Sequence, residues 1–192
     1  MAKHEGEAVN PDGLSPLMGY ISIVELSPDL FRGGILLTNL RGKPQDFRCT
    51  STIKPNAIQR ILYGGTLIEH LAMDLCGLPL LNALPKTPAV LLADRPELLV
   101  LRPTTEIPAL WLRRQSEIQL QGRANDGGEV EMVASEGGLF ETVLASSHAE
   151  YGEDLQETLE WVRQIGQVLD PLEPFARISA ALKLVQDKAG AR

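Results

Sequence analysis

The distribution of apolar residues predicts three strands at the start of the folded part of the chain. "MGYISIVELS" (residues 18–27) carries apolar side chains on both faces, as expected of a central strand covered on both sides. The apolar run at residues 35–37 shares this property. Gly42 then predicts a tight turn, because glycine adopts a positive φ without steric cost. Beyond it, residues 47–53 alternate between an apolar and a polar face, which is typical of a half-solvated strand.

A long helix is predicted within "KPNAIQRILYGGTLIEHLAMDLCGLP" (residues 54–79). Apolar residues recur there at helical spacing, namely Ile58, Ile61, Leu62, Ile68, Leu71, Ala72 and Leu75. Asn56 is suited to cap the helix, and Gly77 favours its end. Gly64 and Gly65 interrupt the pattern at about 1 kcal/mol each relative to alanine. The helix therefore either breaks at these glycines or lies against another backbone.

The second half of the chain is expected to add further strands and two helices. The predicted elements are strands at 88–94, 97–103 and 107–114, a hairpin at 116–135 turning at 126–128, a strand at 138–146, and helices from residue 153 onward separated by Pro171 and Pro174. This order predicts an α+β fold: a mostly antiparallel sheet with one long central helix and two C-terminal helices packed on it. Since the strand at 88–94 follows the long helix, it could pair parallel to the first strand and make the sheet mixed.

Length and local polarity suggest a single folded unit. Residues 1–16 are polar and are predicted to be a disordered tail. The remaining residues, 17–192, fit one α+β domain, with a potential sub-boundary near residue 115.

Composition is that of a soluble globular protein with an aliphatic core. Hydrophobic residues make up 44% of the chain and charged residues 22%, while aromatic residues reach only 5%. No apolar stretch approaches the roughly 18 residues that span a bilayer. The two cysteines, Cys49 and Cys76, fall on different predicted elements and favour neither a disulfide framework nor a zinc site. We therefore expect a cytoplasmic protein with no membrane partner and no cofactor.

Charge is segregated along the chain although the net charge is −7. Residues 31–60 carry six basic side chains against Asp46 alone, a local net of +5; the basic residues are Arg32, Arg41, Lys43, Arg48, Lys54 and Arg60. Residues 125–160 carry ten acidic side chains and no lysine or arginine. One interpretation is that the basic hairpin region contacts an anionic partner, either an acidic protein surface or nucleic-acid phosphate. The alternative is that both patches are solvated faces, or that they pair within the fold.

Trp111 is the residue that most suggests a contact with another subunit. It lies beside Arg113 and Arg114, and tryptophan with arginine is the composition enriched at interface hot spots. This interpretation favours self-association or another protein partner. The alternative is that Trp111 belongs to the core.

Three carboxylates carry a second, enzymatic interpretation. Glu25 lies near the end of the first strand, Glu69 on the long helix and Asp94 at the end of the strand that follows. This order of strands, helix and strand, over about residues 19–94, resembles that of ribonuclease-H-like nucleases, whose carboxylates hold Mg²⁺. Glu25 stands where such folds usually carry an aspartate. The resemblance implies a metal-dependent nuclease or another nucleic-acid-processing enzyme, with these three residues as metal ligands and Mg²⁺ as cofactor.

Other polar motifs give weaker indications. Ser146, Ser147 and His148 precede a predicted helix in a loop where ligands often bind, although adjacent residues seldom present nucleophile and base to one substrate atom. The glycine pairs match neither a P-loop nor a dinucleotide fingerprint, so turns and close packing explain them better.

The leading hypothesis is a non-enzymatic binding or adaptor protein that uses the basic hairpin region. The layout of helices on an antiparallel sheet loosely resembles adaptor folds of the longin and roadblock kind, and the nuclease is the alternative.

Overall fold

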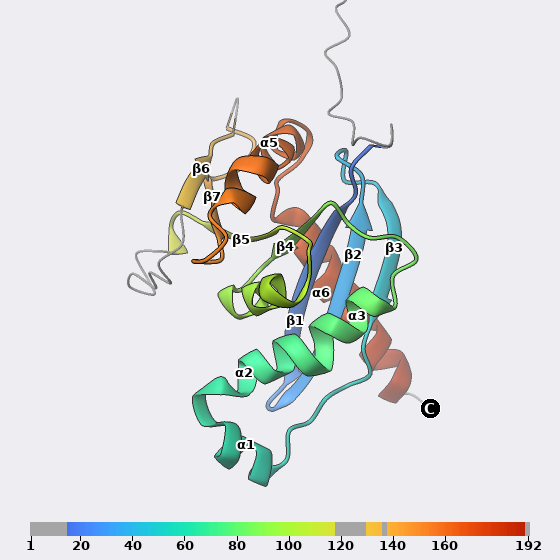
Figure 1. Cartoon of the computed structure of the whole chain (residues 1–192). Helices are drawn as coiled ribbons and strands as arrows, with labels where there is room; N and C mark the ends of the chain where they lie inside the picture. The colour runs from blue at the N-terminus through green and yellow to red at the C-terminus, as the bar shows by residue number, and fades with distance from the viewer. Residues whose placement is uncertain (1–14, 118–129, 136–137, 191–192) are drawn as a thin grey trace, which may run out of the picture.

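The computed structural model describes residues 15–117, 130–135 and 138–190. These residues form the predicted α+β fold, with a seven-stranded sheet in the order β3-β2-β1-β4-β5-β7-β6 (Figure 1). The strands are β1 (Met18–Ser27), β2 (Leu30–Thr38), β3 (Pro44–Cys49), β4 (Val90–Ala93), β5 (Ala109–Arg114), β6 (Val130–Val133) and β7 (Val143–Ser147). The helices are α1 (Ala57–Tyr63), η1 (Gly64–Thr66), α2 (Leu67–His70), the π-helical η2 (Leu71–Gly77), α3 (Leu78–Asn82), the 3₁₀-helical η3 (Pro96–Thr104), α5 (Glu153–Val168) and α6 (Glu173–Gly190).

The sheet is mixed because β4 pairs parallel to β1. Ile21 lies opposite Ala93 in this pair, and β5 continues the parallel arrangement beside β4. The β1–β2, β2–β3, β5–β7 and β6–β7 pairs are antiparallel. The central position predicted for residues 18–27 is confirmed, since β1 lies between β2 and β4.

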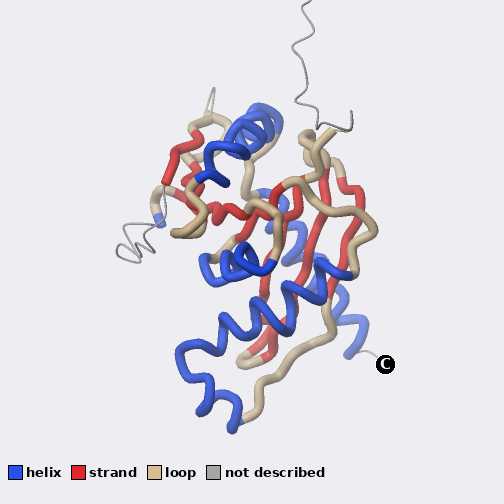
Figure 2. Tube along the Cα trace, in the orientation of Figure 1, coloured by secondary structure: helices blue, strands red, loops and turns tan. Residues whose placement is uncertain are grey.

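Helices cover both faces of the sheet, which explains the apolar residues on both faces of β1 (Figure 2). Tyr20 faces the core beneath α5 and α6, and its ring meets Phe175 edge to face at 5.3 Å between centroids. Ile21 faces the other core, which η2, α3 and η3 close. The two C-terminal helices therefore pack on the sheet as predicted.

Two adjacent glycines let helices approach both faces of β2. A Cβ on Gly33 would meet Cys76 of η2, and a Cβ on Gly34 would meet Ile178 and Leu182 of α6. Close packing, rather than phosphate binding, accounts for this glycine pair. Gly42 has a φ of 69° in the β2–β3 turn, which confirms the predicted turn.

The long helix spans residues 57–82 but changes character along its length. Asn56 caps α1 with a complete capping box to Gln59. Gly64 has a φ of 50°, and a Cβ at this position would meet no atom within 4 Å in the described part of the chain. The helix therefore breaks at the glycines and does not lie against another backbone.

Residues 97–103, predicted as a strand, are helical and belong to η3. Leu98, Leu99 and Leu101 are buried there, a pattern without the strict alternation of a half-buried strand. Of the predicted hairpin at 116–135, β6 is observed, and the turn at 126–128 lies outside the described residues. Most of the predicted tail, residues 1–14, also lies outside them. Within the described residues, no helix combines the length and apolarity needed to cross a membrane.

Candidate functional site

Asp94 occupies the end of β4, where β1 continues beside it. Ser22 Oγ donates a hydrogen bond to Asp94 Oδ2, and Arg95 Nε lies 3.8 Å from Oδ1. Oδ1 is buried and has no hydrogen-bond partner among the described residues. Burial raises the pKa of the Asp94 carboxyl above its ordinary value, and the Ser22 hydroxyl opposes that rise. The Asp94 side chain is thus held by Ser22 and keeps 27% of its surface exposed.

The three carboxylates expected to bind a metal do not come together. Glu25 accepts the backbone N–H of Asp29 at the β1–β2 turn, 2.9 Å away. It lies three residues beyond Ser22 and therefore on the opposite face of β1. Across the described ranges, no group of three or more His, Cys, Asp or Glu side chains could hold a metal ion. The described residues therefore give no support to a Mg²⁺ site built from Glu25, Glu69 and Asp94 together.

Glu69 instead lines a pocket of about 240 Å³ between α2, η3 and the β7–α5 loop. The polar residues that line this pocket are Glu69, Glu97, Ser147 and His148, and Leu99 and Val100 are among its apolar lining residues. We refer to it as the η3 pocket.

The serine and histidine of this loop do not form a nucleophile–base pair. Ser147 is 3% exposed, and its Oγ has no hydrogen-bond partner in the described part of the chain. His148 Nδ1 accepts the backbone N–H of Glu150 at 3.2 Å, and its ring meets Tyr151 edge-on. With Nδ1 an acceptor, the neutral ring carries its proton on Nε2.

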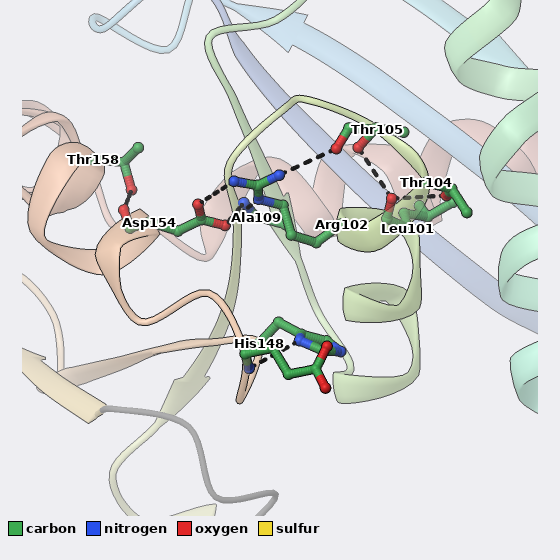
Figure 3. A network of polar contacts seen from close by, with 9 residues as sticks. Leu101, Arg102, Thr104, Thr105, Ala109, His148, Asp154 and Thr158 are labelled. Carbon is green, nitrogen blue, oxygen red and sulfur yellow. Dashed lines mark hydrogen bonds and ion pairs between the residues drawn. The ribbon is translucent and has the colours of Figure 1, made fainter.

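A buried ion pair fixes the loop that carries His148 (Figure 3). Arg102 of η3 donates two hydrogen bonds to Asp154 of α5, at 2.7 and 2.9 Å. Asp154 is fully buried and also accepts the backbone N–H of Ala109. The bond to Asp154 raises the pKa of Arg102, whose guanidinium also lies 4.2 Å from the centre of the Tyr151 ring. Removing one member of such a pair costs about 3–5 kcal/mol, so the loop geometry is strongly held.

Most of the basic side chains predicted to bind a partner are exposed. Arg41 and Lys43 lie at the β2–β3 turn, and Lys54 lies in the segment before α1. Arg48 pairs with Asp46 at 3.0 Å, and Arg60 of α1 pairs with Asp29. These two ion pairs are made within the N-terminal half. Partner binding by the exposed basic residues stays a prediction.

Arg32 and Trp111 are exceptions, because each is only 6% exposed. Trp111 lies in the core beneath η2 and η3, with the Arg113 guanidinium 3.9 Å from its ring centre. The core alternative for Trp111 is therefore the one that the structure supports, and neither residue is available on the surface.

The most exposed apolar surface lies on α1. Ile58, Ile61 and Leu62 are 68%, 80% and 77% exposed. No residue of α1, which the structure describes in full, is buried. We call these three side chains the α1 patch. They share the helical spacing of Leu71 and Ala72, which are buried, yet they lie in solvent.

A groove lies between β6 and α5, near the opposite end of the molecule from α1 (Figure 1). Its volume is about 420 Å³, and its lining residues are Met132, Ala134, Glu160, Arg163, Gly166 and Gln167. Met132 is an exposed apolar side chain, and Glu131 and Glu157 are exposed nearby on the same two elements. We call this surface the β6–α5 groove.

No family model and no curated protein matches the sequence. Among solved structures, the fold resembles that of Ciona intestinalis endonuclease V in complex with a 24mer DNA containing an inosine followed by a ribo-adenosine. The identity is 9% and the TM-score 0.43, over 88% of this chain and 87% of that one. A variant of the same enzyme with a 23mer DNA gives 9% identity and a TM-score of 0.39, over 76% of each chain. The similarity concerns the arrangement of elements alone.

Proposed function

We propose that the protein is a non-enzymatic binding protein that self-associates head to tail. The α1 patch of one copy docks into the β6–α5 groove of the next. The observation that carries the proposal is the α1 patch itself, a capped helix that projects three large aliphatic side chains into solvent.

The α1 patch has the geometry of a docking helix. Ile58, Ile61 and Leu62 follow the i, i+3, i+4 spacing that places side chains on one face of a helix. Each aliphatic side chain contributes about 1.5–3 kcal/mol when fully buried. The capping box holds α1 in helical form before docking, which lowers the entropy cost of binding.

Charge complementarity favours a second copy of this chain as the occupant. Residues 47–68, which include α1, contain Arg48, Lys54 and Arg60 and no acidic residue. Arg48 pairs with Asp46 and Arg60 with Asp29, whereas Lys54 forms no ion pair with a described residue. The opposing surface carries the exposed carboxylates Glu131, Glu157 and Glu160 beside Arg163. Because α1 and the groove lie at distant places on one molecule, they meet only between copies. Such a contact is heterologous and leads to a ring or an open filament.

Light scattering during size-exclusion chromatography tests the assembly. We expect an average mass above the 21.0 kDa of one chain, rising with protein concentration. Ile61→Asp should reduce the mass to that of the monomer, because it places a carboxylate in the docking face. Leu184→Asp is the matched control, since Leu184 is an exposed apolar residue of α6 outside both surfaces.

A mixing experiment identifies the partner surface. Met132→Asp should also give a monomer, because it disrupts the groove while leaving α1 intact. Mixed with Ile61→Asp, it should form a 1:1 dimer and nothing larger, since the mixture offers one intact helix for one intact groove. A wild-type monomer at all concentrations, or two variants that stay monomeric when mixed, would overturn the proposal.

A metal-dependent nuclease is the second candidate, and the element order is the observation that favours it. Three antiparallel strands and a helix precede a strand parallel to the first, with Asp94 at its end. The described residues do not fit a metal, since Asp94 has Ser22 and Arg95 as neighbours and no group of three or more His, Cys, Asp or Glu side chains forms among them.

Thermal unfolding with Mg²⁺ or Mn²⁺ separates the two candidates. If the protein is a nuclease, the metal should raise Tm. Asp94→Asn should then abolish both this rise and the cleavage of DNA or RNA. We expect no metal effect and a Tm that Asp94→Asn raises by a few degrees at pH 7. The folded-state pKa of Asp94 is raised, which means that folding favours the protonated carboxyl. The stability that the protonated carboxyl contributes is complete below the unfolded pKa of about 3.9 and is lost as pH rises. The difference in Tm between Asp94→Asn and the wild type should therefore vanish near pH 4.

A further inference from the structure

Arg32 of β2 is a buried cation without a counter-charge. It is 6% exposed, and its Nε and Nη1 have no hydrogen-bond partner in the described part of the chain. No described carboxylate pairs with it, since the acidic residues near β2 and β3, Asp29 and Asp46, pair with other arginines. A buried charge is costly without a partner, because water no longer solvates it. The fold therefore leaves the environment of Arg32 incomplete.

Arg32 lies on the face of β2 that α6 covers. It is two residues from Gly34, and alternate residues of a strand share a face. A Cβ on Gly34 would meet Leu182 of α6. Tyr20 lies beyond Gly34 on the side away from Arg32, and its ring meets Phe175 near the start of α6. The helix therefore runs past Gly34 towards Arg32, and its last turns lie over the guanidinium.

These last turns of α6 are weakly anchored to the sheet. None of residues 183–188 is buried, in contrast to Leu182. Gln186 follows Leu182 by one helical turn, and its Oε1 is buried without a partner in the described ranges. The partial negative charge of the helix C-terminus compensates Arg32 only in part. A segment with few buried apolar contacts opens at low cost. We call residues 183–188 the α6 end.

Two further hydrogen-bond donors lie beside Arg32. Phe31 and Ile53 exchange two backbone hydrogen bonds of 2.8 Å, which sets these residues opposite each other. Thr52 therefore lies opposite Arg32 and is exposed. Lys54, two residues further on, is also exposed and forms no ion pair with a described residue. The three side chains together offer two positive charges and a hydroxyl, which is the chemistry that binds an oxyanion.

We propose that Arg32, Thr52 and Lys54 bind a phosphate monoester when the α6 end lifts away from the sheet. The guanidinium donates parallel N–H groups to the phosphate oxygens, the Thr52 hydroxyl donates another bond, and Lys54 supplies the second charge. The anion thereby replaces the partial charge of the helix terminus with a full counter-charge. Two cations favour the doubly charged monoester over a singly charged diester. This binding is independent of the α1 patch and goes beyond the proposed self-association.

NMR titration of the monomeric Met132→Asp variant tests the ligand class and keeps the result separate from that of the assembly experiment. Methyl phosphate should bind more tightly than dimethyl phosphate, which carries the diester charge of a nucleic-acid backbone. Dimethyl phosphate that binds as tightly as methyl phosphate would overturn the assignment to a monoester. No binding of either probe would overturn the site itself.

Variants locate the binding to Arg32. Arg32→Met should abolish it, and Arg32→Lys should weaken it at least about tenfold, because an ammonium lacks the paired donors of a guanidinium. Lys54→Met should weaken it by about two- to fivefold, as expected for an exposed charge. Arg48→Met is the matched control, since Arg48 is an exposed arginine that lies opposite Ile35 on the other face of the sheet. Full affinity in Arg32→Met would contradict the proposal.

Hydrogen exchange tests the movement of the α6 end. Arg32→Met should slow exchange of the amides of residues 183–188 several-fold, because an apolar side chain removes the unpaired charge beneath the helix. Saturating methyl phosphate should have the reverse effect in the Met132→Asp variant, since the anion binds the lifted state and increases its population. The amides of residues 175–182 should be unaffected and serve as the internal control. Bound methyl phosphate that slows exchange of the α6 end, or leaves it unchanged, would show that this segment does not move.

Discussion

The α1 and η2 segments belong to one helical run and have similar apolar spacing, yet their environments are opposite. In η2, Leu71, Ala72, Cys76 and Gly77 are buried against the sheet and η3. In α1, by contrast, every residue is exposed or half-buried. Helical spacing therefore specifies a face, whereas the surrounding chain decides whether that face meets a core.

The path of the chain explains the difference. The isolated bridge between Phe31 and Ile53 is the last backbone pairing with the sheet before α1 among the described residues. The chain then leaves the sheet, and α1 extends away from it until the turn at Gly64. Its described ties to the body include the Arg60–Asp29 pair and the ring of Tyr63, stacked on His70 at 4.2 Å. By contrast, η2 lies so close to β2 that only glycine fits at position 33.

Truncating one apolar side chain in each segment should give the largest difference in stability between α1 and η2. Leu71→Ala should lower the free energy of unfolding by about 2–5 kcal/mol, because it leaves a cavity in the core. Ile61→Ala should change it by no more than about 0.5 kcal/mol, since the side chain is already in water. Urea unfolding in the monomeric Met132→Asp background measures both. Similar losses in the two variants would show that α1 is packed after all.

Replacing glycine by alanine compares how closely the backbone is packed in the buried and the exposed parts of the helical run. A Cβ on Gly77 would collide with the Ala72 carbonyl oxygen and the Leu101 side chain, so Gly77→Ala should cost about 1–3 kcal/mol. A Cβ on Gly65 meets no atom within 4 Å in the described residues. Gly65→Ala should therefore be neutral or slightly stabilising. The two melting temperatures, recorded side by side, give the result, and a destabilised Gly65→Ala would contradict it.

The smallest expected effect is at the start of α1. Asn56→Ala removes the capping box and should destabilise the helix locally by about 1 kcal/mol. Because α1 adds little to the core, the global Tm should not change. Hydrogen exchange should quicken several-fold at the α1 amides and stay constant in η2. A loss of protection that extends into η2 would show that the two segments unfold as one unit.

The sequence contained enough to predict the centre of the sheet. Apolar residues on both faces of residues 18–27 indicated a covered central strand, and the order of elements allowed the parallel β4. The secondary structure of residues 97–103 could not be predicted, because a short apolar run with prolines suits a strand or a 3₁₀ helix equally. The burial of Trp111 was likewise undecided until the helices were placed over it.

The candidate sites were predictable only in part. Asp94 was identified from its place at a strand end, but Ser22 was missed, although a lone hydroxyl between Ile21 and Ile23 was a usable signal. The Arg102–Asp154 pair gave no signal, because its members lie far apart in sequence and each resembles an ordinary surface charge. The η3 pocket depends on three elements whose meeting only the tertiary structure specifies.

The parallel pairing of β1 with β4 has a consequence for synthesis on the ribosome. The hairpins of β1, β2 and β3 emerge first, whereas the partner for the other edge of β1 arrives only with Val90 to Ala93. Until then, an apolar strand with unpaired backbone groups is open to neighbouring nascent chains. The interval between these two stages of translation is when the polypeptide most needs a chaperone.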